Sequence, residues 1–205
     1  MKQLGFFFDA RRCNGCKTCV VACKDAHNLP VGRNFRHVLE VTDGKWSKDP
    51  KSGAWKQNVY AYYLSIACNH CSDPACVKVC PTKAIHKEPK YGAVINDPAK
   101  CIGCGLCQKA CPWHVPQYFE DLSKTPMGAK NHPHMTKCDM CVDRLDAGLK
   151  PACVASCPAR ALECLSAEEV KRRHPNATRT APGFDRGKAE MTNPNIVFNP
   201  KRVKV

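Results

Sequence analysis

A dense cysteine run occupies the middle of this chain: Cys101-Ile-Gly-Cys104-Gly-Leu-Cys107-Gln-Lys-Ala-Cys111-Pro112. Its spacing is C-x2-C-x2-C-x3-C-P, and its first three thiols fall within seven residues. Gly103 and Gly105 allow the backbone to turn tightly enough to direct those thiols toward one centre. Cys111 follows Cys107 by about one helical turn. Such a run predicts a metal cluster held by thiolates.

Three further groups of four cysteines repeat this kind of spacing, and we number all four runs in sequence order. Motif one, C-x2-C-x2-C-x3-C, comprises Cys13, Cys16, Cys19 and Cys23. Motif two, C-x2-C-x4-C-x3-C-P, comprises Cys68, Cys71, Cys76 and Cys80, and the run described above is motif three. Motif four, C-x2-C-x11-C-x3-C-P, comprises Cys138, Cys141, Cys153 and Cys157. Together they use sixteen of the seventeen cysteines and leave Cys164.

Disulfides and zinc account for this pattern less well than iron–sulfur clusters do. The number of cysteines is odd, and C-x2-C-x2-C places three thiols too close together for separate disulfide partners. Two C-x2-C pairs suit a zinc ribbon, but zinc does not explain four runs of which three end in Cys-Pro. We therefore predict four [4Fe-4S] clusters, with Cys164 as a small buried apolar side chain that needs no redox role.

The formal net charge of +14 would ordinarily indicate nucleic acid or an anionic surface as partner. Four thiolate-bound clusters bring a charge of about −8 and leave the loaded chain at about +6. No nucleic-acid-binding motif accompanies the basic residues, so no nucleic acid is expected. No apolar run approaches the roughly 18 residues needed to cross a membrane, and no secretory signal precedes motif one, so export would depend on another chain.

Motifs two and three, with a hairpin expected between them, resemble a small bacterial ferredoxin. In such two-cluster proteins the fourth cysteine of each run binds the other cluster. Motifs one and four flank this unit and can pair only across it. The exchange predicts four ligand sets: cluster 1, Cys13, Cys16, Cys19 and Cys157; cluster 2, Cys138, Cys141, Cys153 and Cys23; cluster 3, Cys68, Cys71, Cys76 and Cys111; cluster 4, Cys101, Cys104, Cys107 and Cys80. We expect these four clusters to form a line.

The predicted fold class is α+β, with two nested bacterial-type 2[4Fe-4S] ferredoxin-like domains related by pseudo-twofold symmetry and a C-terminal extension. The outer domain comprises residues 1–60 and 128–174, the inner domain residues 61–127, and the tail residues 175–205, which pack on themselves or on partners. Apolar patterns predict strands at residues 4–9, 35–41, 58–65, 84–86, 93–96, 161–165 and 195–198. A helix is expected at 19–25, and a capping box at Ser166 predicts another that ends near residue 174. The rest of the tail is expected to lack regular structure.

A few residues outside the motifs could have special roles. We expect Trp46 and Trp55 to anchor the loop between two of the strands. His132 and His134 fit a solvated loop better than a metal site. For His70, between two ligands of motif two, packing or solvent exposure is the first expectation, and tuning of a cluster is the alternative.

A cluster with four cysteine ligands has no open iron, so it moves single electrons instead of transforming a substrate. The sequence contains no nucleotide-binding glycine motif and no recognisable catalytic triad or carboxylate pair. We therefore expect no catalytic residue on this chain, which would act as a relay between an electron donor and an acceptor.

The sequence segments between the motifs resemble those of the four-cluster subunits of bacterial dimethyl sulfoxide reductases. The resemblance is carried by Gly5-Phe-Phe-Phe-Asp9, by Asn58-Val-Tyr-Ala-Tyr-Tyr-Leu-Ser65, by His134-Met-Thr-Lys-Cys138 and by Pro194-Asn-Ile-Val197. It covers nearly the whole chain and implies the crossed ligand pattern at all sixteen positions. The sequence departs from the family after Tyr118, where residues 119–133 form a longer connection that puts a partner contact in question.

The resemblance also implies partners. A molybdopterin catalytic subunit would hold a molybdenum bis-pterin guanine dinucleotide cofactor and reduce an S-oxide or N-oxide, and an integral membrane anchor subunit would oxidise quinol. The resulting heterotrimer would be peripheral on the cell membrane, at the extracytoplasmic face through co-export with the catalytic subunit, and the cytoplasmic face is the alternative.

The same relay suits other complexes. Thiosulfate, polysulfide, tetrathionate and arsenate reductases and formate dehydrogenases have equivalent subunits. A stand-alone polyferredoxin and a zinc-binding interaction module are alternatives of other classes.

Overall fold

A computed structural model of the chain describes residues 2–118 and 134–201. Its strands are β1 (Leu4–Asp9), β2 (His37–Asp43), β3 (Trp46–Lys48), β4 (Trp55–Gln57), β5 (Tyr60–Ile66), β6 (Ile85–Lys87), β7 (Val94–Asn96), β8 (Gln117–Tyr118), β9 (Met135–Thr136), β10 (Leu162–Ser166) and β11 (Ile196–Asn199). Its helices are α1 (Thr18–Ala26), α2 (Ala75–Lys78), the 3-10 helix η1 (Pro98–Lys100), α3 (Leu106–Ala110), α4 (Val142–Asp146), α5 (Ala152–Ala155), α6 (Ala167–Arg173) and α7 (Arg186–Thr192). The predicted strands and the two predicted helices are all present, with small shifts of their ends.

The three-stranded sheet joins the two ends of the described chain. β1 lies in its centre, antiparallel to β10 and parallel to β11. Phe6 pairs with Cys164 on one side and with Ile196 on the other. Phe6, Ile196 and Phe198 are almost completely buried. The C-terminal residues therefore pack on the N-terminal strand, because the alternate side chains of β11 are apolar and fill the core beside β1.

The tail also contains more regular structure than the sequence indicated. Helix α7 was not predicted, and it begins where the side chain of Asp185 accepts a hydrogen bond of 3.1 Å from the backbone N–H of Lys188. Asp at this position is a common helix N-cap. The expectation that residues 175–194 lack regular structure is therefore wrong for this segment.

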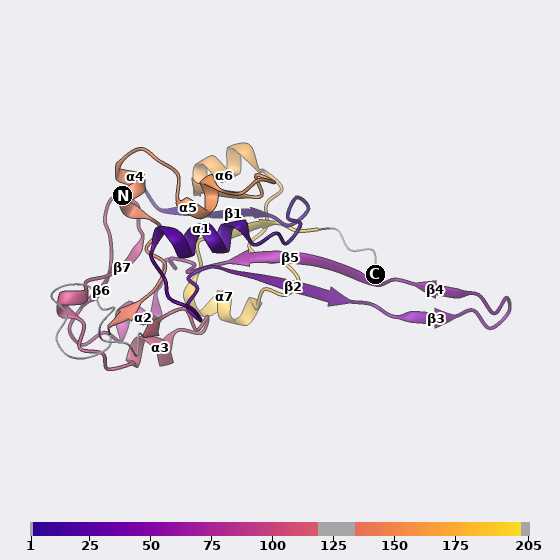
Figure 1. The fold of residues 1–205 in the computed structure, drawn as a ribbon, viewed down its shortest axis with the longest axis horizontal. Helices are drawn as coiled ribbons and strands as arrows, with labels where there is room; N and C mark the ends of the chain where they lie inside the picture. The colour runs from indigo at the N-terminus through magenta and orange to yellow at the C-terminus, as the bar shows by residue number, and fades with distance from the viewer. Residues whose placement is uncertain (1, 119–133, 202–205) are drawn as a thin grey trace.

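Short helices that carry cysteines pack in pairs (Figure 1). Helix α1 packs on α5, and α2 packs on α3. In each pair, the two helices come from different cysteine motifs. Between α2 and α3 lies the predicted hairpin, in which β6 and β7 are antiparallel and Ile85 faces Asn96.

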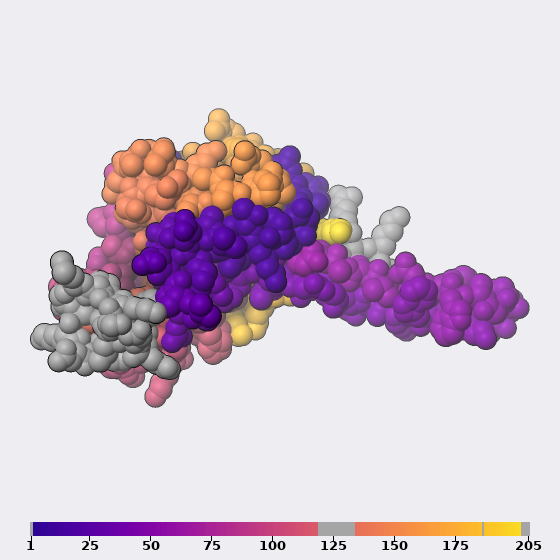
Figure 2. Space-filling model, in the orientation of Figure 1, coloured from indigo at the N-terminus to yellow at the C-terminus, as the bar shows by residue number. Residues whose placement is uncertain are grey.

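A two-stranded arm projects from the body (Figures 1 and 2). Strands β2 and β5 form a ribbon, and β3 and β4 continue it outward. Trp46 faces Gln57 and Lys48 faces Trp55, so both tryptophans lie on the same side of the arm. They are 63% and 64% exposed. The prediction that they anchor a loop is therefore wrong, because they lie on strands and their side chains are exposed.

Two further expectations concern the membrane and the histidine pair. In the part of the chain that the structure describes, no helix is long and apolar enough to span a membrane. The longer connection at residues 119–133 and its His132 lie outside the described residues. His134 is only 1% exposed, so the expectation of a solvated loop is wrong for this residue.

Substitution of Gly5 by alanine should destabilise the sheet. A Cβ at Gly5 would overlap the carbonyl oxygen of Asn195, which accepts a hydrogen bond of 2.9 Å from the N–H of Phe6. Because β11 would have to move, we expect Gly5→Ala to cost about 1–3 kcal/mol, the usual range for overpacking, and to lower the melting temperature of the iron-loaded chain. Gly187→Ala in α7 meets nothing closer than 3.5 Å and should leave the melting temperature unchanged or slightly raised. Equal melting temperatures for the two variants would contradict this account.

Candidate metal centres

All seventeen cysteines lie in the described part of the chain, and none forms a disulfide. Left-handed backbone conformations occur in every cysteine loop. Gly15 in motif one and Gly103 and Gly105 in motif three have φ angles of 77°, 71° and 76°. Motifs two and four adopt this conformation at non-glycine residues, His70 (φ 43°) and Cys141 (φ 52°). Such turns direct successive backbone N–H groups toward one centre, and the sequence pointed only to those at Gly103 and Gly105.

Motifs one and four lie against each other. Burial raises the pKa of the Cys13 thiol, and the neighbouring thiols of Cys19 and Cys157 raise it further. Burial likewise raises the pKa of Cys23 to about 12, with an added contribution from Cys153 and Cys141. The last cysteine of each motif is therefore close to thiols of the other motif.

Thiols of motifs two and three also lie close to each other. Burial raises the pKa of Cys76 to about 12, and its thiol neighbours are Cys68, Cys111 and Cys71. Cys111 of motif three thus lies among the thiols of motif two. A small hollow on the other side is lined by Cys80, Cys101, Cys104 and Cys107. This hollow brings Cys80 of motif two to the first three cysteines of motif three.

His70 connects the inner pair of motifs, two and three, with the outer pair, one and four. Its ring is fully buried, and Nδ1 accepts a hydrogen bond of 2.9 Å from the N–H of Val94. The proton of the neutral ring therefore sits on Nε2, which lies 3.5 Å from the Sγ of Cys138 and donates to it. Burial lowers the pKa of His70 well below its usual value, and the nearby Lys137 and Arg36 lower it further. Solvent exposure is excluded, and His70 is a neutral donor to a cysteine of motif four.

Two further hydrogen-bond partners of the cysteine thiols were not recognised in the sequence. The hydroxyl oxygen of Ser65 lies 3.4 Å from the Sγ of Cys19, and that of Tyr118 lies 3.1 Å from the Sγ of Cys107. Hydrogen bonds to cluster sulfur help to set the reduction potential. Ser65 lies on β5, far along the chain from Cys19, and Tyr118 lies on β8, outside motif three. The spacing of the cysteines could therefore not reveal either residue.

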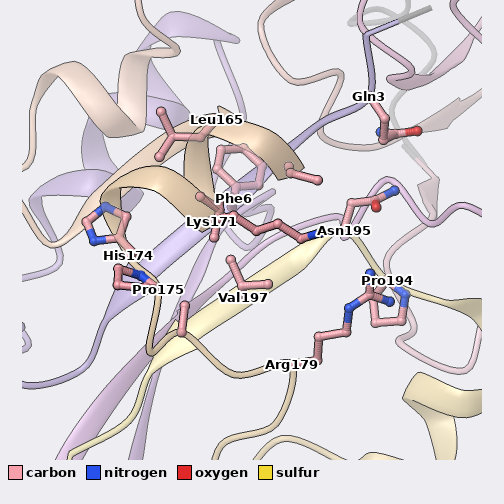
Figure 3. Close-up of a pocket in the computed structure, with 14 residues that line it drawn as sticks. Gln3, Phe6, Leu165, Lys171, His174, Pro175, Arg179, Pro194, Asn195 and Val197 are labelled. Atoms are coloured by element: carbon pink, nitrogen blue, oxygen red, sulfur yellow. The ribbon is translucent and has the colours of Figure 1, made fainter.

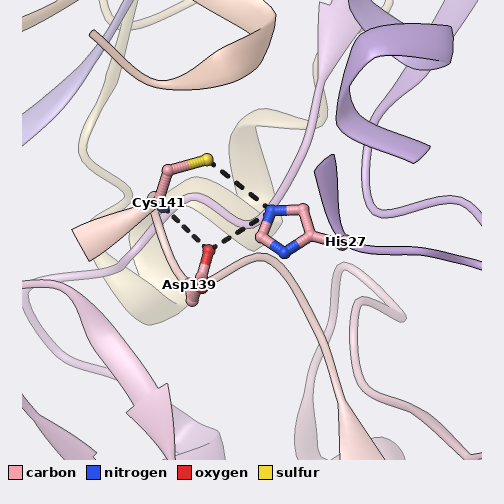
Figure 4. A group of neighbouring side chains, drawn as sticks. All are labelled: His27, Asp139 and Cys141. Atoms are coloured by element: carbon pink, nitrogen blue, oxygen red, sulfur yellow. Dashed lines mark hydrogen bonds and ion pairs between the residues drawn. The ribbon is translucent and has the colours of Figure 1, made fainter. Parts of the chain in front are cut away.

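His27, Asp139 and Cys141 form a compact group (Figure 4). The Nε2 of His27 lies 3.6 Å from both the Oδ1 of Asp139 and the Sγ of Cys141. These residue types could hold a separate metal ion. Because Cys141 already belongs to motif four, we assign the group to that motif, with His27 as a donor to its thiolate.

The donor set fits iron–sulfur clusters. Burial raises the pKa of most of these thiols, for example to about 11 for Cys71 and Cys141, so without metal they are protonated. Cluster binding needs thiolates and compensates for their burial, which couples binding to folding. When bound, the clusters supply one-electron redox chemistry. Cys164 is half-buried on β10 and its pKa is raised to about 12 by burial.

A separate cavity of about 210 Å³ lies between α6 and the sheet (Figure 3). Apolar side chains of Phe6, Leu165 and Val197 line it together with Lys171 and Asn195. No cysteine lines this cavity. It is therefore not one of the cluster positions.

Comparisons with known proteins agree with this chemistry. Two family models described as "4Fe-4S dicluster domain" match residues 59–166 and residues 12–85. The protein is 48% identical to the B subunit of the anaerobic dimethyl sulfoxide reductase of Escherichia coli (strain K12), over 97% of its own length and 89% of the relative. It is 45% identical to the corresponding subunit from Haemophilus influenzae, over 98% and 91%. The "Formate dehydrogenase iron-sulfur subunit" of Wolinella succinogenes is 36% identical, over 78% and 80%.

Two dicluster domains and sixteen grouped cysteines account for four [4Fe-4S] clusters. The mixed helices and strands are of the ferredoxin-like α+β class. Fully ligated clusters transfer single electrons and leave no site for substrate chemistry. This protein belongs to the family of iron–sulfur electron-transfer subunits that includes the B subunits of anaerobic dimethyl sulfoxide reductases.

Proposed function

We propose that this protein relays electrons from a quinol-oxidising membrane anchor subunit to a catalytic subunit that holds a molybdenum bis-pterin guanine dinucleotide cofactor and reduces dimethyl sulfoxide or related S-oxides and N-oxides. The observation that carries the proposal is the similarity to dimethyl sulfoxide reductase B subunits along 97% of the sequence. The complete set of cysteines supports it, since every cluster can be fully ligated and serve as a relay.

Within this proposal the ligands are exchanged between motifs. Motifs one and four together bind clusters 1 and 2, and motifs two and three together bind clusters 3 and 4. The sixteen ligands are those of the four sets predicted from the sequence. Cys13 and Cys23 of motif one have thiols of motif four as neighbours, and Cys76 of motif two has a thiol of motif three as a neighbour. Cys80 of motif two also lines the same hollow as three cysteines of motif three. These neighbours support the exchange.

We infer the order of the clusters from neighbouring thiols that belong to different sets. Burial raises the pKa of Cys138 in cluster 2, and the thiol of Cys68 in cluster 3 raises it further. Cys19 of cluster 1 has Cys153 of cluster 2 as a neighbour. These contacts support a line in the order 1, 2, 3, 4, with His70 at the junction of the inner and outer pairs.

This line implies two nested ferredoxin-like domains related by a pseudo-twofold axis. The outer domain is formed by residues 1–60 with 128–174, the inner domain by residues 61–127, and residues 175–205 are an extension. The packing of α1 on α5 and of α2 on α3 supports the repeat, because each pair brings two exchanging motifs together.

The exposed arm supports association with another subunit. Exposed tryptophans are enriched at protein interfaces, and an isolated two-stranded ribbon is only marginally stable in water. We propose that the tryptophan face of the arm, Trp46 and Trp55, contacts another subunit of the complex, and the catalytic subunit is the partner to be tested first. The assembled heterotrimer would lie peripherally on the cell membrane, at the extracytoplasmic face if the catalytic subunit carries both chains across.

A second candidate is the equivalent subunit of a formate dehydrogenase. It is favoured by the 36% identity with the iron–sulfur subunit from Wolinella succinogenes. The fold and the clusters would be the same, and only the catalytic partner would differ.

Purification of the native complex tests the function. We expect an anaerobic preparation from the native membrane to contain about 16 irons per chain, molybdenum in a larger co-purifying subunit, and quinol-dependent reduction of dimethyl sulfoxide. Iron and molybdenum with formate oxidation would establish the second candidate. Iron without molybdenum or any partner would contradict both and indicate a stand-alone polyferredoxin.

Replacement of Cys80 tests the exchanged ligands. We expect Cys80→Ser to damage cluster 4, held by motif three, and to spare cluster 3, because Cys80 lines the hollow of motif three. Electron paramagnetic resonance of the reduced complex would identify the missing cluster by comparison with Cys101→Ser. Cys164→Ser is the control and should retain all signals. Loss of the signal that Cys68→Ser removes would show that the exchange is wrong.

Replacement of the two tryptophans tests the arm. We expect Trp46→Ala with Trp55→Ala to weaken binding of the catalytic subunit, since a tryptophan in an interface contributes about 2 kcal/mol. The measurement is the ratio of the two subunits after purification, with iron per chain unchanged. Val31→Ala removes another highly exposed apolar side chain, 97% exposed, and should have no effect. An unchanged subunit ratio in the double variant would exclude the arm as the interface.

A further inference from the structure

Arg36 is a cation in the interior of the protein. It immediately precedes β2, and only 1% of the residue is exposed. Its guanidinium lies 4.6 Å from the centre of the Phe6 ring. Nη1 donates hydrogen bonds to the carbonyl oxygen and to the hydroxyl oxygen of Ser65, at 3.2 and 3.1 Å. These contacts hold the side chain in one place between β1 and β5.

The hydrogen-bonding capacity of this guanidinium is only partly used. Nε and Nη2 are buried and have no acceptor among the described residues. No carboxylate within the described ranges 2–118 and 134–201 forms an ion pair with Arg36. A buried charge without a partner is very unfavourable, and arginine remains protonated in proteins. A negatively charged group that accepts hydrogen bonds would therefore stabilise the buried guanidinium.

The groups around Arg36 are cysteine thiols. Burial opposes its charge, but thiolates of Cys153, Cys138, Cys19 and Cys23 favour it and raise its pKa. Three of these four cysteines belong to the ligand set of cluster 2. The fourth, Cys19, belongs to cluster 1 and is reached through Ser65, whose hydroxyl lies 3.4 Å from its Sγ.

We propose that Arg36 is the counter-charge of cluster 2, that its Nε–H and Nη2–H donate to sulfur of that cluster, and that it raises the reduction potential of cluster 2. The inference rests on the proposed ligand exchange, because it is the exchange that brings Cys23, Cys138 and Cys153 into one set.

The physical basis is electrostatic. Reduction adds one electron from a neighbouring cluster of the relay, forms and breaks no covalent bond, and moves no proton. A fixed positive charge in a medium of low dielectric constant stabilises the reduced form more than the oxidised form. Charge and hydrogen bonds to sulfur are the factors that set cluster potentials. Arg36 makes cluster 2 easier to reduce than it would be in a neutral pocket.

Redox titration of variants in the purified native complex tests this role. Arg36→Gln removes the charge and keeps a polar side chain, whereas Arg36→Lys keeps the charge and loses the planar donors. Arg172→Gln is the matched control, since it removes the same charge from the exposed surface of α6. Cluster 2 is identified as the electron paramagnetic resonance signal that Cys153→Ser removes. Iron content is measured for every variant.

At the ambient potential where wild-type cluster 2 is half reduced, we expect Arg36→Gln to lower its ratio of reduced to oxidised form about tenfold, a shift of about 59 mV for a one-electron couple. Arg36→Lys should restore most of this loss, and Arg172→Gln should have no effect. If Arg36→Gln fails to assemble cluster 2 while Arg36→Lys assembles it, the need for charge is also supported.

Three outcomes would overturn the inference. The first is a fully assembled Arg36→Gln complex in which all four potentials equal those of the wild type. The second is loss of every cluster in both Arg36 variants, which would indicate packing on Phe6 as the role. The third is an equal shift of all clusters in Arg36→Gln and Arg172→Gln. A wild-type complex without [4Fe-4S] signals would refute the proposed function instead.

Discussion

The burial of cysteine thiols is the constraint on which the rest of this protein depends. Most of these side chains lie in the interior, where burial favours the protonated thiol and raises the pKa to about 12 for Cys23 and Cys76. A metal cluster replaces those protons and accepts the hydrogen bonds that the loops direct inward. The short helices, the left-handed turns and the small hairpins bury few apolar side chains of their own. A core of this size is too small to be stable alone, so the folding of these elements is coupled to cluster binding.

A second requirement follows from placing several negative clusters inside one protein. Their charge has to be balanced in the interior, where water and salt screen poorly. The structure places Arg36 and Lys137 there, both buried and bonded to neutral oxygens, while His70 is kept neutral and donates to Cys138. Some of the basic residues that give the sequence its positive net charge therefore lie in the interior, although composition alone would place them all on the surface. These interior groups gather where the inner and outer motifs meet.

Two parts of the fold serve assembly more than cluster binding. The sheet β10–β1–β11 ties the C-terminal residues to the N-terminal strand through buried Phe6, Ile196 and Phe198. The same sheet brings β1, which precedes motif one, beside β10, which follows motif four. Trp46 and Trp55, in contrast, lie on β3 and β4, which project from the body as an arm, and both are exposed. The cysteines and the exposed tryptophans are thus found in different parts of the protein, the first in the body and the second on the arm.

The sequence by itself determined the number and kind of clusters, the resemblance to the family, and most strands, because these depend on local spacing and on alternation of apolar residues. It also predicted the capping box at Ser166, which the structure confirms. Only the tertiary structure decided which side chains surround the clusters. Arg36, Ser65 and His27 are remote in sequence from the thiols they approach, and contacts between distant segments leave no periodic pattern. The exposed tryptophans and the buried His134 were mispredicted for the same reason, since burial is a property of the assembled fold.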